Sequence, residues 1–304
     1  MHSLAIVSAF FAMASAHGVV LSVEGANGVT MPGLSIADGT PRDCSSNRCG
    51  SQADTSIIRD REIRSGEASA LGRTQGNGPV DASVMISSFL GTGNANNIPT
   101  NNGTESAAGV EDDLSNLPKG NNQGNNNNNR RRQLGNLLGG LFGGGRGGGG
   151  EKTETAEETS VAASAGEGAT KGLPTASDNG EVTMTYRQIN QDGAGPMTAE
   201  IDATSGGTDP DAFQTAEVTQ DVPGIGIQGL SLATNTDFPL KVQMPQGMTC
   251  EGSVGGANNV CIVRVRNGAA AGPFGGSGAF TQSATARKRA IAFRLKKRME
   301  IVRY

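Results

Sequence analysis

Apolar and polar side chains alternate in several short runs of the chain, and this alternation predicts strands. In the clearest run, residues 181–189, Val182, Met184 and Tyr186 share one side. Shorter runs rich in strand-forming residues lie at 18–25, 84–90, 240–244 and 260–266. Gly, Pro and Asn occupy the gaps between runs, as they do in turns. The pattern predicts a mostly β fold, an antiparallel, immunoglobulin-like β-sandwich with long loops.

Two segments carry helical signals instead. Residues 59–64 predict a short helix within a loop. Near the C-terminal end, Ile291, Leu295 and Met299 recur at helical spacing, although Ile291, Phe293 and Leu295 also alternate as in a strand. A helix over 284–302 is the favoured alternative there.

The N-terminal segment has the pattern of a signal peptide. Residues 4–14 form an apolar run, and Ala14-Ser15-Ala16 supplies the small residues of a cleavage site. A membrane anchor is the alternative, but the run is shorter than the roughly 20 residues that span a bilayer. We therefore expect residues 1–16 to be removed, the protein to be secreted and His17 to become the first residue.

A low-complexity segment divides the rest of the chain. Residues 117–171 combine Asn runs, Gly runs and an acidic Thr/Glu/Ala stretch. Such a composition buries too little apolar surface to offset its ordering entropy, which predicts a disordered insert. The predicted organisation is one β-rich domain in two halves, 17–116 and 172–284, followed by a basic tail, 285–304.

Composition and charge narrow the function. The chain has 46 Gly, no Trp and a net charge of −4, yet residues 287–304 carry eight Lys/Arg and one Glu. An acidic body with a basic end does not suggest nucleic-acid binding, for which a basic stripe across the folded domain would be expected. The tail is compatible with dibasic processing sites, with a surface-binding patch on anionic lipid or wall polymer, and with a solvated helix.

The four cysteines predict disulfides. Cys44 and Cys49 close a short loop, and Cys250 and Cys261 flank a Gly/Asn-rich turn. Three connectivities are possible, and two local bridges are the simplest in a secreted protein. A zinc site is disfavoured because the spacings match no common zinc pattern. Asn102-Gly103-Thr104 is an N-glycosylation acceptor, which fits the secretory route.

An acidic run between residues 200 and 221 could in principle supply paired carboxylates for glycoside hydrolysis. Sugar sites normally also present aromatic platforms, and these are scarce here. The run is therefore interpreted as a solvated face.

Four phrases of the sequence resemble one known family. They are the start at His17-Gly18-Val19-Val20 and the stretches 186–196, 220–224 and 267–276. These phrases are similar to those of the fungal Egh-type virulence factors, also called Gas- or Mas-like cell-surface proteins. The resemblance implies an extracellular or wall-associated protein acting around appressorium formation and host penetration. Its partners would be fungal or host cell-wall polysaccharide or a host surface.

The candidate chemistry concentrates on His17. An N-terminal histidine offers its α-amine and its imidazole to one metal, and Cu(II) favours such nitrogen donors. The start resembles that of lytic polysaccharide monooxygenases, which also have β-sandwich bodies and complete a copper brace with a second histidine. His17 is the sole histidine after residue 16. A carboxylate, phenol or amide would have to substitute, and the candidates are Asp192, Tyr186, Gln188 and Gln191.

Each candidate also has a structural interpretation. Asp192-Gly193 is a common turn pair, Tyr186 fits a core position, and the glutamines fit solvent. Cleavage can also fall before a histidine that binds nothing.

The favoured function is non-enzymatic binding of wall polysaccharide or copper. The alternative is a copper-dependent, polysaccharide-oxidising enzyme with a divergent brace.

Overall fold

The computed structural model describes residues 17–45, 49–92, 98–101, 150–152, 155–191, 193–224, 229–269 and 271–301. The strands are β1 (Gly18–Glu24), β2 (Thr30–Pro32), β3 (Ser56–Ile57), β4 (Arg73–Thr74), β5 (Gly78–Pro79), β6 (Glu151–Lys152), β7 (Thr175–Ala176), β8 (Glu181–Gln188), β9 (Thr198–Asp202), β10 (Phe213–Gln220), β11 (Thr236–Gln243), β12 (Gly252–Val254), β13 (Ala257–Arg266) and β14 (Phe274–Gln282). The helices are α1 (Asp60–Ser65), α2 (Ala82–Leu90), α4 (Ser160–Ser164), α5 (Gly168–Lys171), α6 (Ala284–Ile301) and the 3-10 turn η1 (Pro210–Ala212).

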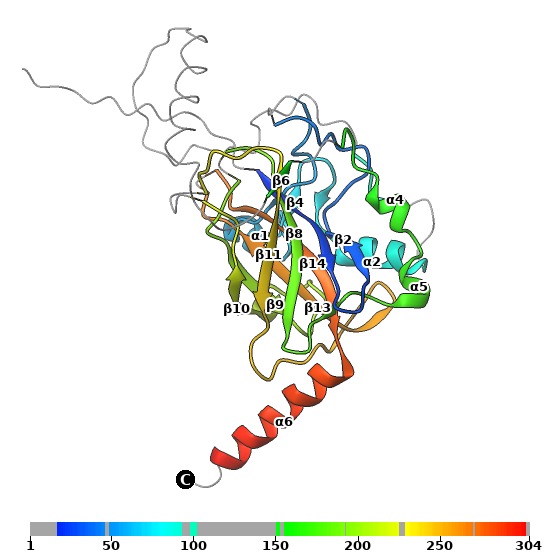
Figure 1. The fold of residues 1–304 in the computed structure, drawn as a ribbon, viewed down its shortest axis with the longest axis vertical. Coiled ribbons are helices and arrows are strands. Elements are labelled where there is room, and N and C mark those ends of the chain that lie inside the picture. The colour runs from blue at the N-terminus through cyan, green and yellow to red at the C-terminus, as the bar shows by residue number, and fades with distance from the viewer. Residues whose placement is uncertain are drawn as a thin grey trace, which may run out of the picture.

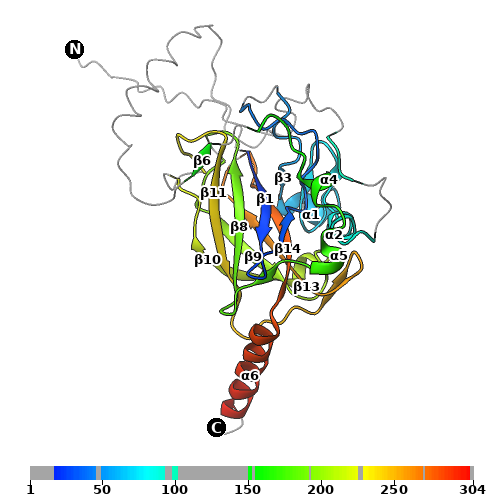
Figure 2. The same cartoon turned by 45° about the vertical axis from the view of Figure 1, so that its right-hand side comes forward.

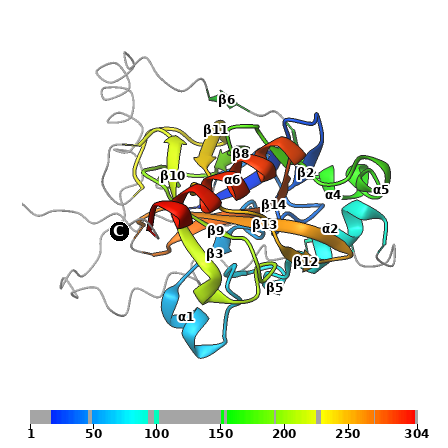
Figure 3. The same ribbon diagram turned by 90° about the horizontal axis from the view of Figure 1, so that it is seen from below.

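The strands follow one path in the order β2-β1-β8-β11-β10-β9-β13-β14-β3-β4-β5. β10 belongs to both layers, because residues 213–216 pair with β9 and residues 217–220 pair with β11. Figure 3 views the two layers from one end, with β8, β10 and β11 above β9, β13 and β14. Among the paired strands of the described residues, only β7 with β14 is parallel. The prediction of a mostly β, antiparallel, sandwich-like fold is confirmed.

The N-terminal strand β1 is buried on both faces. Val20 and Val23 belong to the core between the layers, together with side chains of β8, β9, β11 and β13. Val19 points into a second core, which includes Met85 and Phe89 of α2. In Figure 1, α2, α4 and α5 cover the side of the sheet next to β1 and β2. Burial on both faces fixes the strand that directly follows His17.

The strand predicted at residues 84–90 is wrong, because these residues form α2. Asp81 accepts a hydrogen bond from the Ser83 backbone N–H at 2.8 Å and caps the helix. Gly91 ends it in the left-handed conformation. The buried residues of α2 recur at helical spacing, and they are Ala82, Met85, Ile86 and Phe89. The strands expected at 18–25, 181–189, 240–244 and 260–266 and the helices at 59–64 and 284–302 are all present, with small shifts of their ends.

The boundary predicted for the disordered insert at residue 171 lies too late. Residues 117–149 are outside the described residues, but residues 155–171 contain α4 and α5. Val161 of α4 is 1% exposed in the second core, and its backbone N–H donates to the Asp38 carboxylate at 3.0 Å. Val161 thus gives this stretch a buried apolar anchor, and composition alone does not reveal such a place.

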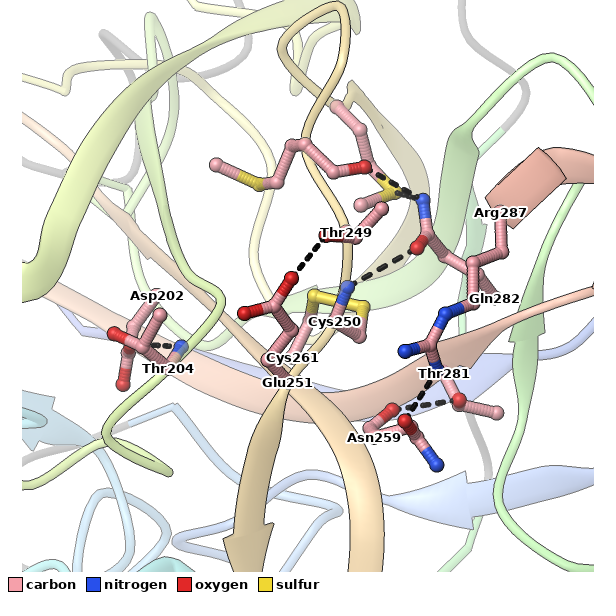
Figure 4. Close-up of a disulfide and its surroundings, with 12 residues drawn as sticks. Asp202, Thr204, Thr249, Cys250, Glu251, Asn259, Cys261, Thr281, Gln282 and Arg287 are labelled. Atoms are coloured by element: carbon pink, nitrogen blue, oxygen red, sulfur yellow. Dashed lines mark hydrogen bonds between the residues drawn. A yellow bond between two sulfur atoms is a disulfide. The ribbon is translucent and has the colours of Figure 1, made fainter. Parts of the chain in front are cut away.

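Both local disulfides form, Cys44–Cys49 and Cys250–Cys261. The second is buried where β13 lies beside β14, and the Cys250 backbone N–H donates to the Gln282 side chain at 3.0 Å (Figure 4). The bridge closes the base of the β12–β13 hairpin, and the hydrogen bond ties this hairpin to the strand that leads into α6. No helix in the described part of the chain is long and apolar enough to cross a membrane.

Candidate functional site

His17 lies immediately before β1, and two of its nitrogens face one side chain. Its backbone N–H donates to Oδ1 of Asn190 at 2.6 Å, and its ring Nδ1 lies 3.4 Å from Nδ2 of Asn190. The Asn190 amide group is a donor, so Nδ1 acts as the acceptor in this contact. His17 O accepts from the Ile189 backbone N–H at 3.0 Å. The turn after β8 thus holds both the backbone and the ring of His17.

Phe274 holds the other side of the imidazole. The two ring centroids are 4.4 Å apart, with the planes tilted by 40°. Phe274 is itself fixed, because its backbone N–H donates to Oδ1 of Asn267 at 3.1 Å. His17 is 1% exposed in this uncleaved chain, in which its nitrogen is still an amide. The imidazole is therefore held by its neighbours on both sides.

Tyr186 lies on β8 beneath the start of β1. Its hydroxyl donates to Gly193 O at 3.0 Å, and a Cβ on Gly18 would lie 2.5 Å from its Cζ. Burial raises the pKa of the Tyr186 phenol far above its ordinary value, and the charge of Asp221 adds to the rise. A protonated phenol that already donates to a carbonyl supports the turn around His17. Its role as a metal ligand stays a prediction.

The two glutamines lie in different environments. Gln188 is fully buried, and its Nε2 donates to Asn190 O at 3.0 Å and to Ser231 Oγ at 2.7 Å. The interpretation of Gln188 as a solvated side chain is therefore wrong, because its amide crosslinks the turn to the 231–233 loop. Gln191 is exposed. Asp192, the carboxylate candidate, and Asn102, the glycosylation candidate, lie outside the described residues.

The acidic run at 200–221 is more than a solvated face. Asp202 is fully buried and accepts from the backbone N–H groups of Thr204 and Gly207 at 2.8 and 2.6 Å. Burial alone would raise the pKa of Asp202, but these hydrogen bonds and those of Ser205 lower it overall. Glu200 pairs with Arg264 at 2.5 Å. These carboxylates hold a turn and a strand pair in place.

Chemically, the site offers two nitrogens of His17 and the amide oxygen of Asn190. Within the described ranges, no three His, Cys, Asp or Glu side chains come close enough to hold a metal ion. The imidazole nitrogen and the amide oxygen are of the type that Cu(II) accepts, and the backbone nitrogen, which faces the same amide, would become a donor only as a free amine. Asn190 does not stand out in the sequence, although it lies inside one of the phrases that carry the family resemblance. The alternation of apolar and polar residues ends at Asn190, so the pattern does not indicate to which side its side chain points.

Comparisons with known proteins identify the family of this chain. The family model described as Egh16-like virulence factor matches residues 15–275. The appressoria-specific virulence factor GAS2 of Pyricularia oryzae is 53% identical over 297 residues, which cover 97% of this chain and 94% of the relative. The appressoria-specific virulence factor GAS1 of the same fungus is 41% identical over 134 residues, 43% of this chain and 52% of the relative. No solved structure matches. The chain belongs to the Egh16-like virulence factor family.

Proposed function

We propose that this protein is secreted by a fungal appressorium and acts outside the cell during host penetration. Its similarity to GAS2 of Pyricularia oryzae extends over nearly the whole chain, and that relative is described as an appressoria-specific virulence factor. The apolar run before Ala14-Ser15-Ala16 supports export. Wall polysaccharide or a host surface is the proposed macromolecular partner, and the protein acts by binding.

The contact of His17 with Asn190 carries the proposal of a copper site. Removal of residues 1–16 converts the nitrogen that now donates to Asn190 Oδ1 into an amine. That amine, the ring Nδ1 and Asn190 Oδ1 would then hold Cu(II), and Phe274 would fix the ring plane. Bound Cu(II) supplies a Lewis acid that can also change oxidation state. Burial of the surrounding turn would keep the three donors in place.

Binding is favoured over oxidative catalysis. A copper brace of the monooxygenase type needs a second imidazole, and the two histidines of the sequence are His2, in the expected leader, and His17. The position of His17 is set by an amide of Asn190 instead. An amide oxygen is a weaker and harder ligand than an imidazole, so it suits retention of Cu(II) better than cycling to Cu(I).

Copper titration of the secreted protein tests this proposal. We expect one Cu(II) per chain and an axial electron paramagnetic resonance signal, because such a signal is typical of Cu(II) held by nitrogen and oxygen donors in a tetragonal site. Adding one residue before His17 should abolish tight binding, since it turns the amine back into an amide. Asn190→Ala should weaken binding about 10-fold or more. The matched control, Asn258→Ala, removes an exposed asparagine of the β12–β13 hairpin and should change nothing. Weak, non-stoichiometric binding that ignores the added residue would refute the copper site.

A further inference from the structure

The C-terminal helix α6 stands away from the body of the protein. It follows β14 directly and projects beyond the end of the sandwich (Figures 1 and 2). Its first turns are attached, since Ala286 is 5% exposed and Arg287 donates to the Asn259 side chain (Figure 4). Arg294 adds a contact to Thr249 Oγ1 at 3.0 Å. Residues 291–300, by contrast, are all exposed.

An apolar stripe runs along the exposed part of α6. Ile291, Leu295 and Met299 follow each other at intervals of four residues, so they lie on one face. They are 39%, 53% and 61% exposed. Phe293 lies on the opposite face, against Gly247, at a cleft of about 260 Å³ between α6 and the body. The stripe therefore belongs to the side of α6 that the body does not cover.

Basic side chains flank this stripe. α6 carries seven Lys/Arg and one acidic residue. Lys288 and Arg298 are three residues from Ile291 and Leu295, which makes them neighbours on the helix surface. Among the described residues, no acidic side chain forms an ion pair with Lys288, Lys296, Lys297 or Arg298. Arg294 lies three and four residues before Lys297 and Arg298, so these like charges repel each other, and a helix end without packing is marginal in water. An external anionic surface would remove both costs.

We propose that α6 is a peripheral membrane-binding helix that docks on an anionic lipid surface. Clustered Lys/Arg on a helix are attracted to anionic headgroups, and an adjoining apolar stripe enters the boundary of the acyl chains. A polyanionic polysaccharide would satisfy the charges but would leave Ile291, Leu295 and Met299 in water, so lipid is the better match.

Docking through α6 would orient the whole molecule. Arg289 donates to Asp178 O at 3.1 Å, just before β8 begins. The other end of β8 pairs Gln188 with Gly18, beside His17. The strand of eight residues separates these two ends by about 25 Å. The His17 end would then face away from the membrane, whether or not it binds copper.

Vesicle co-sedimentation of the protein purified from culture medium tests this inference. Binding is expected to vesicles with equal amounts of phosphatidylcholine and phosphatidylserine, to fall with added salt, and to be weak on phosphatidylcholine alone. Lys288→Gln, Lys296→Gln and Arg298→Gln together should weaken binding roughly 100-fold, since each charge contributes a factor of about five. The control is Lys152→Gln, which removes an exposed lysine of β6.

A second variant separates lipid from polysaccharide. Leu295→Ser with Met299→Ser should weaken vesicle binding about 10-fold or more. Leu232→Ser is the matched control, because Leu232 is 54% exposed and lies outside α6. These sites are all exposed, so an unchanged melting temperature shows that each variant folds. Equal binding to both vesicle types would overturn the inference. The inference would also be overturned if the Leu295→Ser/Met299→Ser variant bound vesicles normally and the protein bound soluble polygalacturonate tightly. That result would assign α6 to binding a polysaccharide.

Discussion

Replacing Arg42 by Met is expected to lower the free energy of unfolding by about 3–5 kcal/mol. The Arg42 guanidinium donates to both oxygens of Asp54, at 3.0 and 2.5 Å, and to Glu158 at 2.9 Å. Arg42 and Asp54 are 2% and 0% exposed. The substitution leaves the Asp54 carboxylate buried without its cation, and this is the main source of the cost. Urea denaturation followed by circular dichroism measures the effect.

Two further variants make this test specific. Lys171→Met breaks an exposed pair with Glu167 and should cost no more than about 0.5 kcal/mol. Arg42→Met combined with Asp54→Leu removes both buried charges and should recover much of the loss. Equal costs for the exposed and the buried pair would show that this cluster does not hold the 155–171 segment to the body.

The same cluster contributes to the pH dependence of stability. Burial alone would raise the pKa of Glu158, but the charge of Arg42 and the hydrogen bonds of Ser160 lower it overall. A carboxylate with a lowered pKa in the folded state stabilises the protein above its unfolded pKa. That contribution is lost as the pH falls through the folded pKa. Stability in Arg42→Met should therefore fall less steeply on acidification than in the natural chain.

Gly193→Ala is expected to destabilise the protein near the upper end of the 1–3 kcal/mol typical of overpacking, and to weaken copper binding with it. A Cβ at this position would lie 2.6 Å from the carbonyl carbon of His17 and would overlap its oxygen. These are backbone atoms, so no flexible side chain can move aside. Gly193 O also accepts the Tyr186 hydroxyl, which the shift would disturb.

Gly268→Ala is the matched control for this substitution. Its Cβ would meet no atom within 4 Å, so stability should be unchanged or slightly increased. Thermal unfolding and copper titration of both variants give the comparison. If the Gly193→Ala variant is destabilised but binds copper with normal affinity, the turn at Gly193 does not contribute to copper binding.

Much of the fold could be predicted because local patterns and tertiary burial agree. Val182, Met184 and Tyr186 alternate and all enter the core between the layers. At α2 the sequence pattern predicts a strand where the structure has a helix, because the apolar residues Val84, Met85 and Ile86 suit both. The Asp81 cap and the terminal Gly91 were the signals that could have decided it.

β14 was missed for a different reason. Gly275, Gly276 and Gly278 resemble loop composition, yet each allows a close approach of neighbouring chain. A Cβ on Gly276 would lie 2.8 Å from the Val20 backbone nitrogen of β1. Such a requirement depends on what packs opposite, which no local pattern contains.

The candidate site was predicted in part. His17 was identified from its place after the expected cleavage site, and the structure surrounds it with fixed partners. Asn190 was not, because its contact with His17 joins residues 173 positions apart. Tyr186 and Gln188 were named as donors, and their hydrogen bonds instead support the turn that carries Asn190.

The proposed copper site requires the backbone nitrogen of His17 to be a free amine facing Asn190. The most direct test is the N-terminal sequence and intact mass of the protein recovered from the medium. We predict a mature chain that begins His17-Gly18-Val19. A chain that keeps residues before His17 would carry an amide in place of the amine, and a chain that begins later would lack the imidazole. Either result would rule out the proposed copper site.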